Sequence, residues 1–119
     1  INDGVNPLLE TIKNADVLVF GTPIYYYSIT GQLKTFLDRL TPIYDSNHKF
    51  RDVYLLATAA DMEIEAMDGA IREIEGWISC FEDVKLKGIV CATGASDIGD
   101  IEKKPEKIKE VYTIGKNIK

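Results

Sequence analysis

The chain has little of the chemistry that cysteine and histidine supply. Its 119 residues include two cysteines, Cys80 and Cys91, and a single histidine, His48. Two cysteines are too few for a disulfide framework, and these two lie too far apart for a CxxC pair. Cys91 lies in an apolar run and is expected to be a small buried hydrophobic residue. His48 has no acidic or cysteine partner at ligand spacing, so we expect neither a metal nor a catalytic role for it. This composition fits a reducing compartment, the cytoplasm.

Long hydrophobic runs and a surplus of basic residues are also missing. Although 45% of the residues are hydrophobic, no apolar run approaches the roughly 20 residues that span a bilayer, so no membrane partner is expected. The net charge is −5, with acids gathered between Asp61 and Glu75 and lysines between Lys103 and Lys119. A nucleic acid partner needs a basic patch, and the only one here falls on a terminal helix. We interpret both clusters as solvated helix faces and expect no nucleic acid partner.

The apolar pattern predicts one domain in which helices and strands alternate along the chain. Strict alternation is typical of a parallel sheet with right-handed crossovers and helices on both faces. The unbroken run from Val17 to Phe20 indicates a strand buried on both faces. Lysines alternate with apolar residues in the last strand, which indicates a sheet edge. The predicted helices cover residues 7–14, 31–44, 64–81 and 105–115, and the predicted strands cover 17–20, 53–57 and 84–92, with 45–51 a polar connector.

Three features of the helices can be predicted in more detail. The side chain of Asn6 is expected to cap the first helix, with Pro7 in its first turn. In the long central helix, apolar residues recur every three or four positions and form a buried stripe; they are Ile64, Met67, Ile71, Ile74, Ile78 and Phe81. In the last helix, the residues expected to face inward are Ile108, Val111, Tyr112 and Gly115.

The loop after the first strand contains three adjacent tyrosines. It leaves the carboxyl end of the strand, where open parallel sheets bind their ligands. Pro23 fixes the start of the turn, the backbone amides from Ile24 to Tyr26 are expected to face a ligand, and Tyr25 or Tyr26 can lie against it. On composition alone, a tyrosine patch on a surface or interface is an equally good interpretation, because tyrosine is enriched in contacts of every kind.

The order of residues in this segment favours a ligand site. The sequence TPIYYYSITGQLKTFLDR resembles the segment with which NAD(P)H-dependent FMN reductases and iron-sulfur flavoproteins, members of the flavodoxin-like superfamily, wrap the flavin ring. The matching residues are Thr22, Pro23, Ile24, Tyr25, Tyr26, Ser28, Leu33, Lys34, Asp38 and Arg39. A weaker similarity to the family's closing loop and last helix involves Gly94, Gly99, Asp100, Pro105 and Gly115. The resemblance extends over nearly the whole chain but corresponds to the carboxyl-terminal two thirds of the family.

The resemblance implies a flavodoxin-like, doubly wound parallel sheet that is truncated to its last three strands, the third to the fifth, with flanking helices. Residues 1–119 would form a single flavodoxin-like domain that lacks its amino-terminal phosphate-binding portion. The chain starts at Ile1, and we expect it to be a fragment in which the strand Val17 to Phe20 is a bare edge. The cysteine cluster of the iron-sulfur members would lie upstream of this chain.

The resemblance also implies an FMN-dependent oxidoreductase that transfers hydride or electrons from NAD(P)H to a small acceptor, such as a flavin or a quinone. The cofactor-binding residues would be Thr22, Pro23, Ile24, Tyr25 and Tyr26, joined by Thr58, whose loop would reach the pyrimidine side of the ring. Many relatives have glycines where this chain has Ala59 and Ala60. Lys34, Asp38 and Arg39 would be residues of the helix face and dimer contact, and a homodimer or higher oligomer is expected.

Two other functions are compatible with an α/β fold. One is a flavodoxin-type FMN electron carrier that acts on protein partners and does not use a nicotinamide. The other is a flavin-free interaction module such as a receiver domain, which needs an aspartate at the carboxyl end of its central strand. This chain has Gly21 and Thr22 at that place, which argues against the receiver domain.

Overall fold

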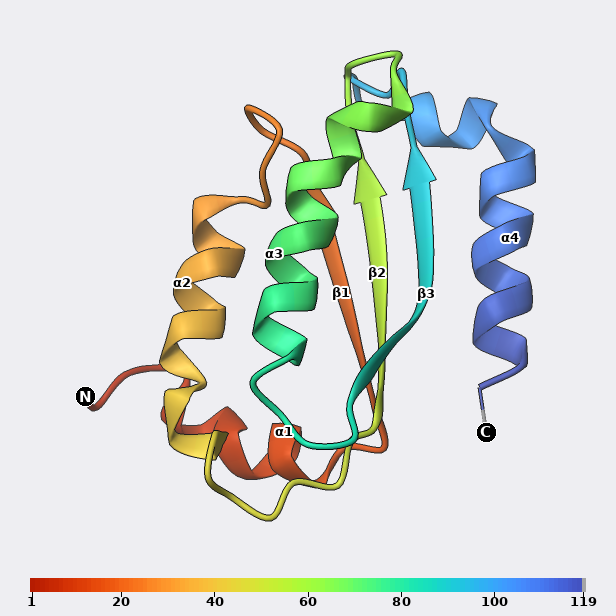
Figure 1. Cartoon of the computed structure of the whole chain (residues 1–119). Helices are drawn as coiled ribbons and strands as arrows, with labels where there is room; N and C mark the ends of the chain where they lie inside the picture. Colours follow the sequence, from red (N-terminus) through yellow and green to blue (C-terminus); the bar gives the residue numbers. More distant parts are fainter. Residues whose placement is uncertain (119) are drawn as a thin grey trace.

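The predicted alternation of helices and strands is confirmed in the computed structural model, which describes residues 1–118 (Figure 1). Lys119, the last residue of the lysine cluster, lies outside the described residues. The main elements are α1 (Leu9–Asn14), β1 (Val17–Pro23), α2 (Gly31–Arg39), β2 (Asp52–Thr58), α3 (Asp68–Ile78), β3 (Lys85–Ala92) and α4 (Pro105–Lys116). Short 3-10 helices cover Asn6–Leu8, Thr41–Ile43, Ile64–Met67 and Asp100–Lys103.

The described strands form one parallel sheet in the order β1-β2-β3. The register pairs Pro23 with Thr58 and Thr58 with Ala92, so the three strands end side by side. Each strand then leads into a loop at the same edge of the sheet, at the top of Figure 1. The register therefore gathers the three loops that follow the strands into one place, as a parallel sheet requires.

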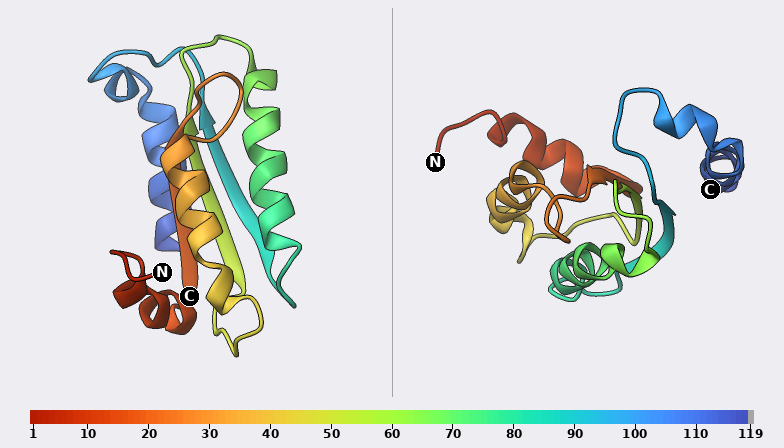
Figure 2. Two further views of the ribbon diagram at one scale, coloured as in Figure 1. Left: turned by 90° about the vertical axis from the view of Figure 1, so that its left-hand side faces the viewer. Right: turned by 90° about the horizontal axis from the view of Figure 1, so that it is seen from above.

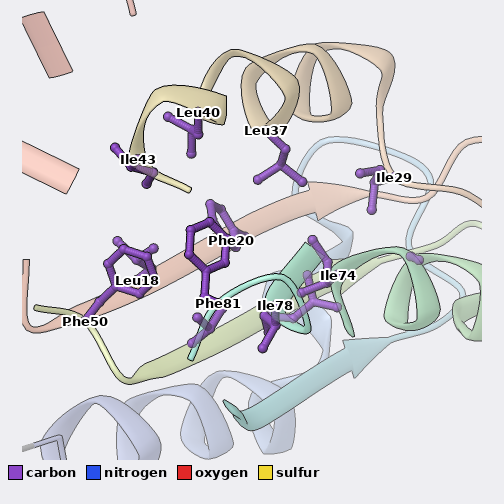
Figure 3. Close-up of a cluster of buried hydrophobic side chains, with 13 residues drawn as sticks. Leu18, Phe20, Ile29, Leu37, Leu40, Ile43, Phe50, Ile74, Ile78 and Phe81 are labelled. Atoms are coloured by element: carbon purple, nitrogen blue, oxygen red, sulfur yellow. The ribbon is translucent and has the colours of Figure 1, made fainter. Parts of the chain in front are cut away.

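The hydrophobic core lies between the sheet and helices α2 and α3. Figure 3 shows side chains of β1, α2 and α3 meeting there, with Phe20 among them. The ring of Phe20 meets Trp77 of α3 edge to face, with 5.5 Å between centroids. Burying a side chain of this size contributes about 1.5–3 kcal/mol. The fully or nearly fully buried members include Leu37, Leu40, Ile43, Phe50, Val53, Leu55, Ala70, Ile74 and Ile78.

The connector before β2 contributes to this core, although the sequence predicted a polar segment. Phe50 is fully buried and His48 is buried beside it. The two rings stack with 4.5 Å between centroids, and His48 also meets Phe81 edge to face at 5.3 Å. The guanidinium of Arg51 donates a hydrogen bond to the carbonyl of Phe50 at 2.8 Å, which stabilises the conformation of this segment. The histidine is therefore a core residue at the end of the sheet opposite to the clustered loops.

Strand β1 is buried on one face, which corrects the prediction of a strand buried on both. Leu18 and Phe20 point into the core, whereas Val19 is 51% exposed. The physical reason is the placement of α4, which stands alone on the second face of the sheet and packs against β3 (Figures 1 and 2). Within the described residues, no element covers the second face of β1.

The inward face of the last helix agrees with the prediction in part, since Ile108 and Val111 face the sheet across a groove whereas Tyr112 and Gly115 do not. Ile108 is 47% exposed and Tyr112 is 69% exposed, while Val111 and Ile114 are half-buried. Gly115, also predicted to face inward, is exposed. A groove of about 470 Å³ remains between α4 and the sheet. Its lining is mostly apolar and includes Gly21, Pro23, Leu56, Val90, Ile108 and Val111.

Two details of the other helices also differ from the prediction. Asn6 is the first residue of a 3-10 helix whose N-cap position is occupied by Val5, so the helix has no side-chain cap. The amide oxygen of Asn6 accepts a hydrogen bond from Arg39 at 3.1 Å. Ile64 lies in the 3-10 turn before α3 and is 54% exposed, whereas Met67 and Ile74 of the same stripe are buried. None of the helices in the described part of the chain combines the length and the apolar character that crossing a membrane requires.

Candidate functional site

Backbone hydrogen bonds join the three loops at the carboxyl edge of the sheet into one unit. The amide of Ile24 donates to the carbonyl of Thr58 at 2.7 Å, which extends the β1–β2 ladder past the end of β1. The amide of Ala59 donates to Ala92 at 2.9 Å, and the carbonyl of Ala59 accepts from Ala95 at 2.8 Å. The loops after β1, β2 and β3 are therefore held in fixed positions relative to one another.

The loop after β1 contains a tight turn made of the tyrosines. Tyr25 and Ser28 exchange two backbone hydrogen bonds, of 3.1 and 3.2 Å. Between them, Tyr26 and Tyr27 adopt left-handed backbone conformations with φ of 51° and 65°. Such a conformation costs about 1–2 kcal/mol for a residue other than glycine. The turn presents all three rings to solvent, and Tyr26 is 98% exposed.

Thr22 anchors the base of this loop. It is buried, and its hydroxyl donates to the carbonyl of Pro23 at 2.7 Å and accepts from the amide of Thr30 at 3.2 Å. The hydroxyl of Thr30 in turn accepts from the amide of Leu33 and caps α2. The side chain of Thr22, one of the predicted cofactor-binding residues, is therefore committed to shaping the loop.

The backbone donors available at the site differ from those expected from the sequence. The amides of Ile24 and Tyr25 are already bonded to Thr58 and Ser28. Of the range that was expected to face a ligand, only the amide of Tyr26 has no acceptor within residues 1–118. The loop after β2 offers further such donors, among them the amides of residues 60 and 61. The amides of Ile24 and Tyr25 are used in strand pairing and in closing the turn. Neither of these hydrogen bonds can be predicted from the local sequence.

A cleft of about 440 Å³ opens between the three loops. Four of the predicted site residues line it: Pro23, Ile24, Tyr25 and Thr58. Within the described residues, the hydroxyl of Thr58 has no hydrogen-bond partner. A smaller hollow of about 220 Å³ adjoins the cleft, since Ile24 and Ala60 line both. The hollow also contacts Tyr26 and Tyr27. Cavities of about 300–1,000 Å³ are typical of small-molecule sites.

The third wall of the cleft is the loop after β3, which the sequence analysis did not assign to the site. Residues 95–99 line the cleft. The carboxylate of Asp100 accepts from the amides of Ser96 and Asp97 at 3.0 and 2.9 Å, and it pairs with Lys103 at 2.9 Å. These bonds, led by the one from Asp97, lower the pKa of Asp100 to about 2. The only advance signal was the weak similarity at Gly94, Gly99 and Asp100.

Arg39 lies away from the cleft and has a structural partner. Its guanidinium donates to Asp3, at 2.8 Å in one of the two bonds, and thereby fastens the amino-terminal segment to α2. Chiefly because of the hydrogen bond from Arg39, the pKa of Asp3 is lowered to about 2. Lys34 and Asp38 form an exposed pair one turn apart on α2, at 2.7 Å. None of these side chains lines the cleft.

The described part of the chain contains neither a metal-binding group of side chains nor a cysteine placed at the cleft. Residues 1–118 contain no group of three or more metal-ligating side chains. Cys91 is buried in β3, and burial raises the pKa of its thiol, which keeps it protonated. Cys80 is exposed at the end of α3, far along the helix from the loops.

Comparison with known proteins decides the family. The model of the family described as NADPH-dependent FMN reductase matches residues 1–81, which is more than half of the chain. The chain belongs to the NADPH-dependent FMN reductase family. The match includes β1, the tyrosine turn and β2, which form two of the three walls of the cleft. The resemblance inferred from TPIYYYSITGQLKTFLDR is thereby confirmed.

Individual relatives of this FMN reductase family member agree with that assignment. An iron-sulfur flavoprotein of Archaeoglobus fulgidus is 27% identical over 118 residues, covering 98% of this chain and 50% of that protein. An FMN-dependent NADH:quinone oxidoreductase of Nocardia farcinica is 51% identical over 37 residues, or 31% of this chain and 17% of that protein. The chain spans about half the length of the first of these relatives.

Solved structures confirm the flavodoxin-like fold. The structure of the Trp repressor binding protein from Bacillus subtilis superimposes with a TM-score of 0.75 at 25% identity. The superposition covers 92% of this chain and 68% of that one. In this fold, the three parallel strands and their helices are arranged as the sequence predicted, with the loops after the strands at one edge.

Proposed function

We propose that this protein is an FMN-dependent oxidoreductase that passes hydride or electrons from NAD(P)H to a small acceptor, such as a flavin or a quinone. One observation carries the proposal. A member of the NADPH-dependent FMN reductase family has a cleft at the carboxyl edge of its sheet, with unpaired backbone donors and exposed tyrosine rings at the rim. A flat ring system with a polar edge is the ligand that such a cleft suits best.

The described residues fit the ring half of FMN. The isoalloxazine is a flat aromatic system whose pyrimidine edge carries carbonyl oxygens and ring nitrogens that need hydrogen-bond donors. The amides of Tyr26, Ala60 and Asp61 can supply such donors. The unpaired hydroxyl of Thr58 can serve as one more, and Tyr25 lines the cleft where a ring could lie against it. Ala60 has a small side chain, which lets the backbone of that loop approach a ligand closely.

For hydride transfer through FMN, the protein mainly has to bind the flavin and orient it. When bound, FMN itself supplies the hydride-accepting and hydride-donating chemistry. The residues of this chain would hold the ring by its polar edge, orient it in the cleft, and keep water off one face with the tyrosines. No general acid or base is required among them.

Several backbone amides near the cleft are already hydrogen-bonded and would not be free to bind the phosphate of FMN. The amides of Ser96 and Asp97 in the third loop are occupied by the carboxylate of Asp100, whose negative charge would repel an anion. The first-turn amide of Leu33 in α2 is capped by Thr30. We propose that the phosphate is held by a segment paired with the free edge of β1. The share of the iron-sulfur flavoprotein that this chain leaves uncovered supports this proposal.

The remaining features of the proposed protein are its assembly, compartment and further cofactors. We propose a homodimer or higher oligomer, because three exposed tyrosines beside the cleft form a surface of the kind that interfaces use. The scarcity of cysteine supports the cytoplasm as its compartment. Any iron-sulfur cluster would be held by residues outside this chain, since residues 1–118 contain no cluster of ligands.

The visible absorbance spectrum of the full-length protein tests this function. We expect a flavin spectrum that bleaches when NADPH or NADH is added without oxygen and returns when quinone or free flavin is supplied. A spectrum that bleaches with dithionite but with neither nicotinamide would favour the flavodoxin-type electron carrier. A colourless protein that takes up no added FMN would refute both flavin functions.

A further inference from the structure

Two residues of α3 contact the tyrosine turn from far along the sequence. The hydroxyl of Ser28 donates to the carboxylate of Glu73 at 2.7 Å, a side-chain bond between residues 45 positions apart. Gly69 lies one helical turn before Glu73, and a Cβ atom added there would overlap the carbonyl oxygen of Tyr27. Residues four apart lie on the same face of a helix. One face of α3 therefore holds the turn at two points.

The turn needs such support because its own conformation is unfavourable. Tyr26 and Tyr27 both have positive φ. This backbone conformation costs about 1–2 kcal/mol for each residue that has a side chain. Strained conformations of this kind persist only where the surroundings determine them. The two backbone bonds between Tyr25 and Ser28 close the turn but do not orient it relative to the cleft. The contacts with Glu73 and Gly69 do, because both residues belong to a helix that is anchored in the core.

We propose that Glu73 and Gly69 are positioning residues for the cofactor. They hold the Tyr25–Ser28 turn so that Tyr25 remains at the cleft and Tyr26, with its unpaired amide, remains at the adjoining hollow. This inference rests on the proposed function, because the ligand that the turn is positioned for is FMN. It also separates Glu73 from the rest of the acidic cluster, which the sequence analysis interpreted as a solvated face. Glu73 is half-buried, whereas Glu75 on the same helix is exposed.

The test uses the full-length protein with FMN, in a double-mutant cycle. Ser28→Ala and Glu73→Ala each remove one partner of the bond, and each is expected to raise the dissociation constant of FMN about tenfold. The double variant should lose no more than either single variant, since both remove the same interaction. Glu73→Gln keeps an acceptor oxygen and should restore affinity to within about twofold of the wild type.

Two further variants make the comparison specific. Glu75→Ala removes the same charge from the same helix and should leave FMN affinity unchanged. Gly69→Ala leaves every hydrogen-bonding group in place but displaces the Tyr27 carbonyl, and should weaken FMN binding and raise the fluorescence of bound flavin as a tyrosine moves off the ring. Independent, additive losses for Ser28→Ala and Glu73→Ala, or a loss in Glu73→Ala no larger than in Glu75→Ala, would overturn the proposal.

A measurement without flavin separates this proposal from the proposed function. In the flavin-free protein, amide hydrogen exchange at Tyr25 and Ser28 reports whether the turn is closed. Exchange should become faster in Ser28→Ala, Glu73→Ala and Gly69→Ala but not in Glu75→Ala. If the variants exchange at the wild-type rate, α3 does not hold the turn and the proposal is wrong. If they exchange faster but no form binds FMN, the proposed function and the positioning role for FMN both fail, and only the contact stands.

Discussion

Replacing Thr22 by valine tests whether this threonine shapes the loop or binds the cofactor. The two side chains have nearly the same shape, so the change removes the hydroxyl and leaves no cavity. It deprives the carbonyl of Pro23 of a donor and the amide of Thr30 of an acceptor. A buried polar group left without its partner costs about 1–3 kcal/mol. Because Thr30 is only half-buried, we take the lower end for each group and expect a loss of about 2 kcal/mol.

Urea unfolding of the full-length, flavin-free protein measures this loss. With a slope of about 2 kcal/mol per molar urea, the midpoint should fall by about 1 M. Thr41→Val is the matched control, because the hydroxyl of Thr41 donates to the carbonyl of Asp38 on the exposed surface, where water can replace it. Its effect should stay within about 0.5 kcal/mol. Thr22→Ser keeps the hydroxyl and should retain part of the stability.

The affinity for FMN distinguishes the two roles of Thr22. If the hydroxyl shapes the loop, Thr22→Val loses stability without flavin and also binds FMN more weakly. If the hydroxyl instead contacts FMN directly, the flavin-free protein should unfold at the wild-type midpoint and only the affinity should fall. A Thr22→Val protein as stable as Thr41→Val would therefore refute the assignment of Thr22 as the anchor of the loop.

Three further outcomes follow from the structure. Phe50→Ala should lower the free energy of unfolding by about 3–5 kcal/mol, as measured in urea, because this ring is fully buried; a loss under 1 kcal/mol would contradict its place in the core. The pKa values of Asp3 and Asp100 are lowered from 3.8 to about 2, so both carboxylates stabilise the fold above about pH 4 and lose that effect as the pH falls through 2; unfolding midpoints between pH 5 and pH 2 should drop less in Asp3→Asn and Asp100→Asn variants than in the wild type. Residues 1–119 alone should self-associate through the free edge of β1, and Val19→Lys, at an exposed position of that strand, should shift sedimentation toward the monomer; a wild-type chain that is monomeric at high concentration would contradict this.

Several features of this chain could be predicted because they depend on neighbouring residues. The apolar runs that end at Phe20, Ala57 and Ala92 each lead into a loop, so the order of strands and helices follows from periodicity alone. The segment from Thr22 to Arg39 indicated the family, and the family model confirms it. Parallel pairing then places the loop after β1 and the loop after β2 at the same edge of the sheet.

Other features could not be predicted because they depend on which distant groups meet. A polar composition gave no sign that Phe50 and His48 complete an aromatic cluster with Phe81. The inward face of α4 depends on which strand it packs against, and in the described residues α4 packs mainly against β3. Hydrophobic periodicity describes one helix or strand at a time and contains no information about the element packed against it.

Local patterns in the sequence were enough to predict a parallel α/β fold, the family, and the position of the tyrosines after the first strand. Which backbone groups at the site remain available depends on how distant segments pair in the folded chain. Pairing of Ile24 with Thr58 removes one expected donor, and closure of the turn at Tyr25 removes another. Only folding brings Ser28 to Glu73. Each backbone amide has a single hydrogen to donate, and the register of distant segments decides which acceptor receives it.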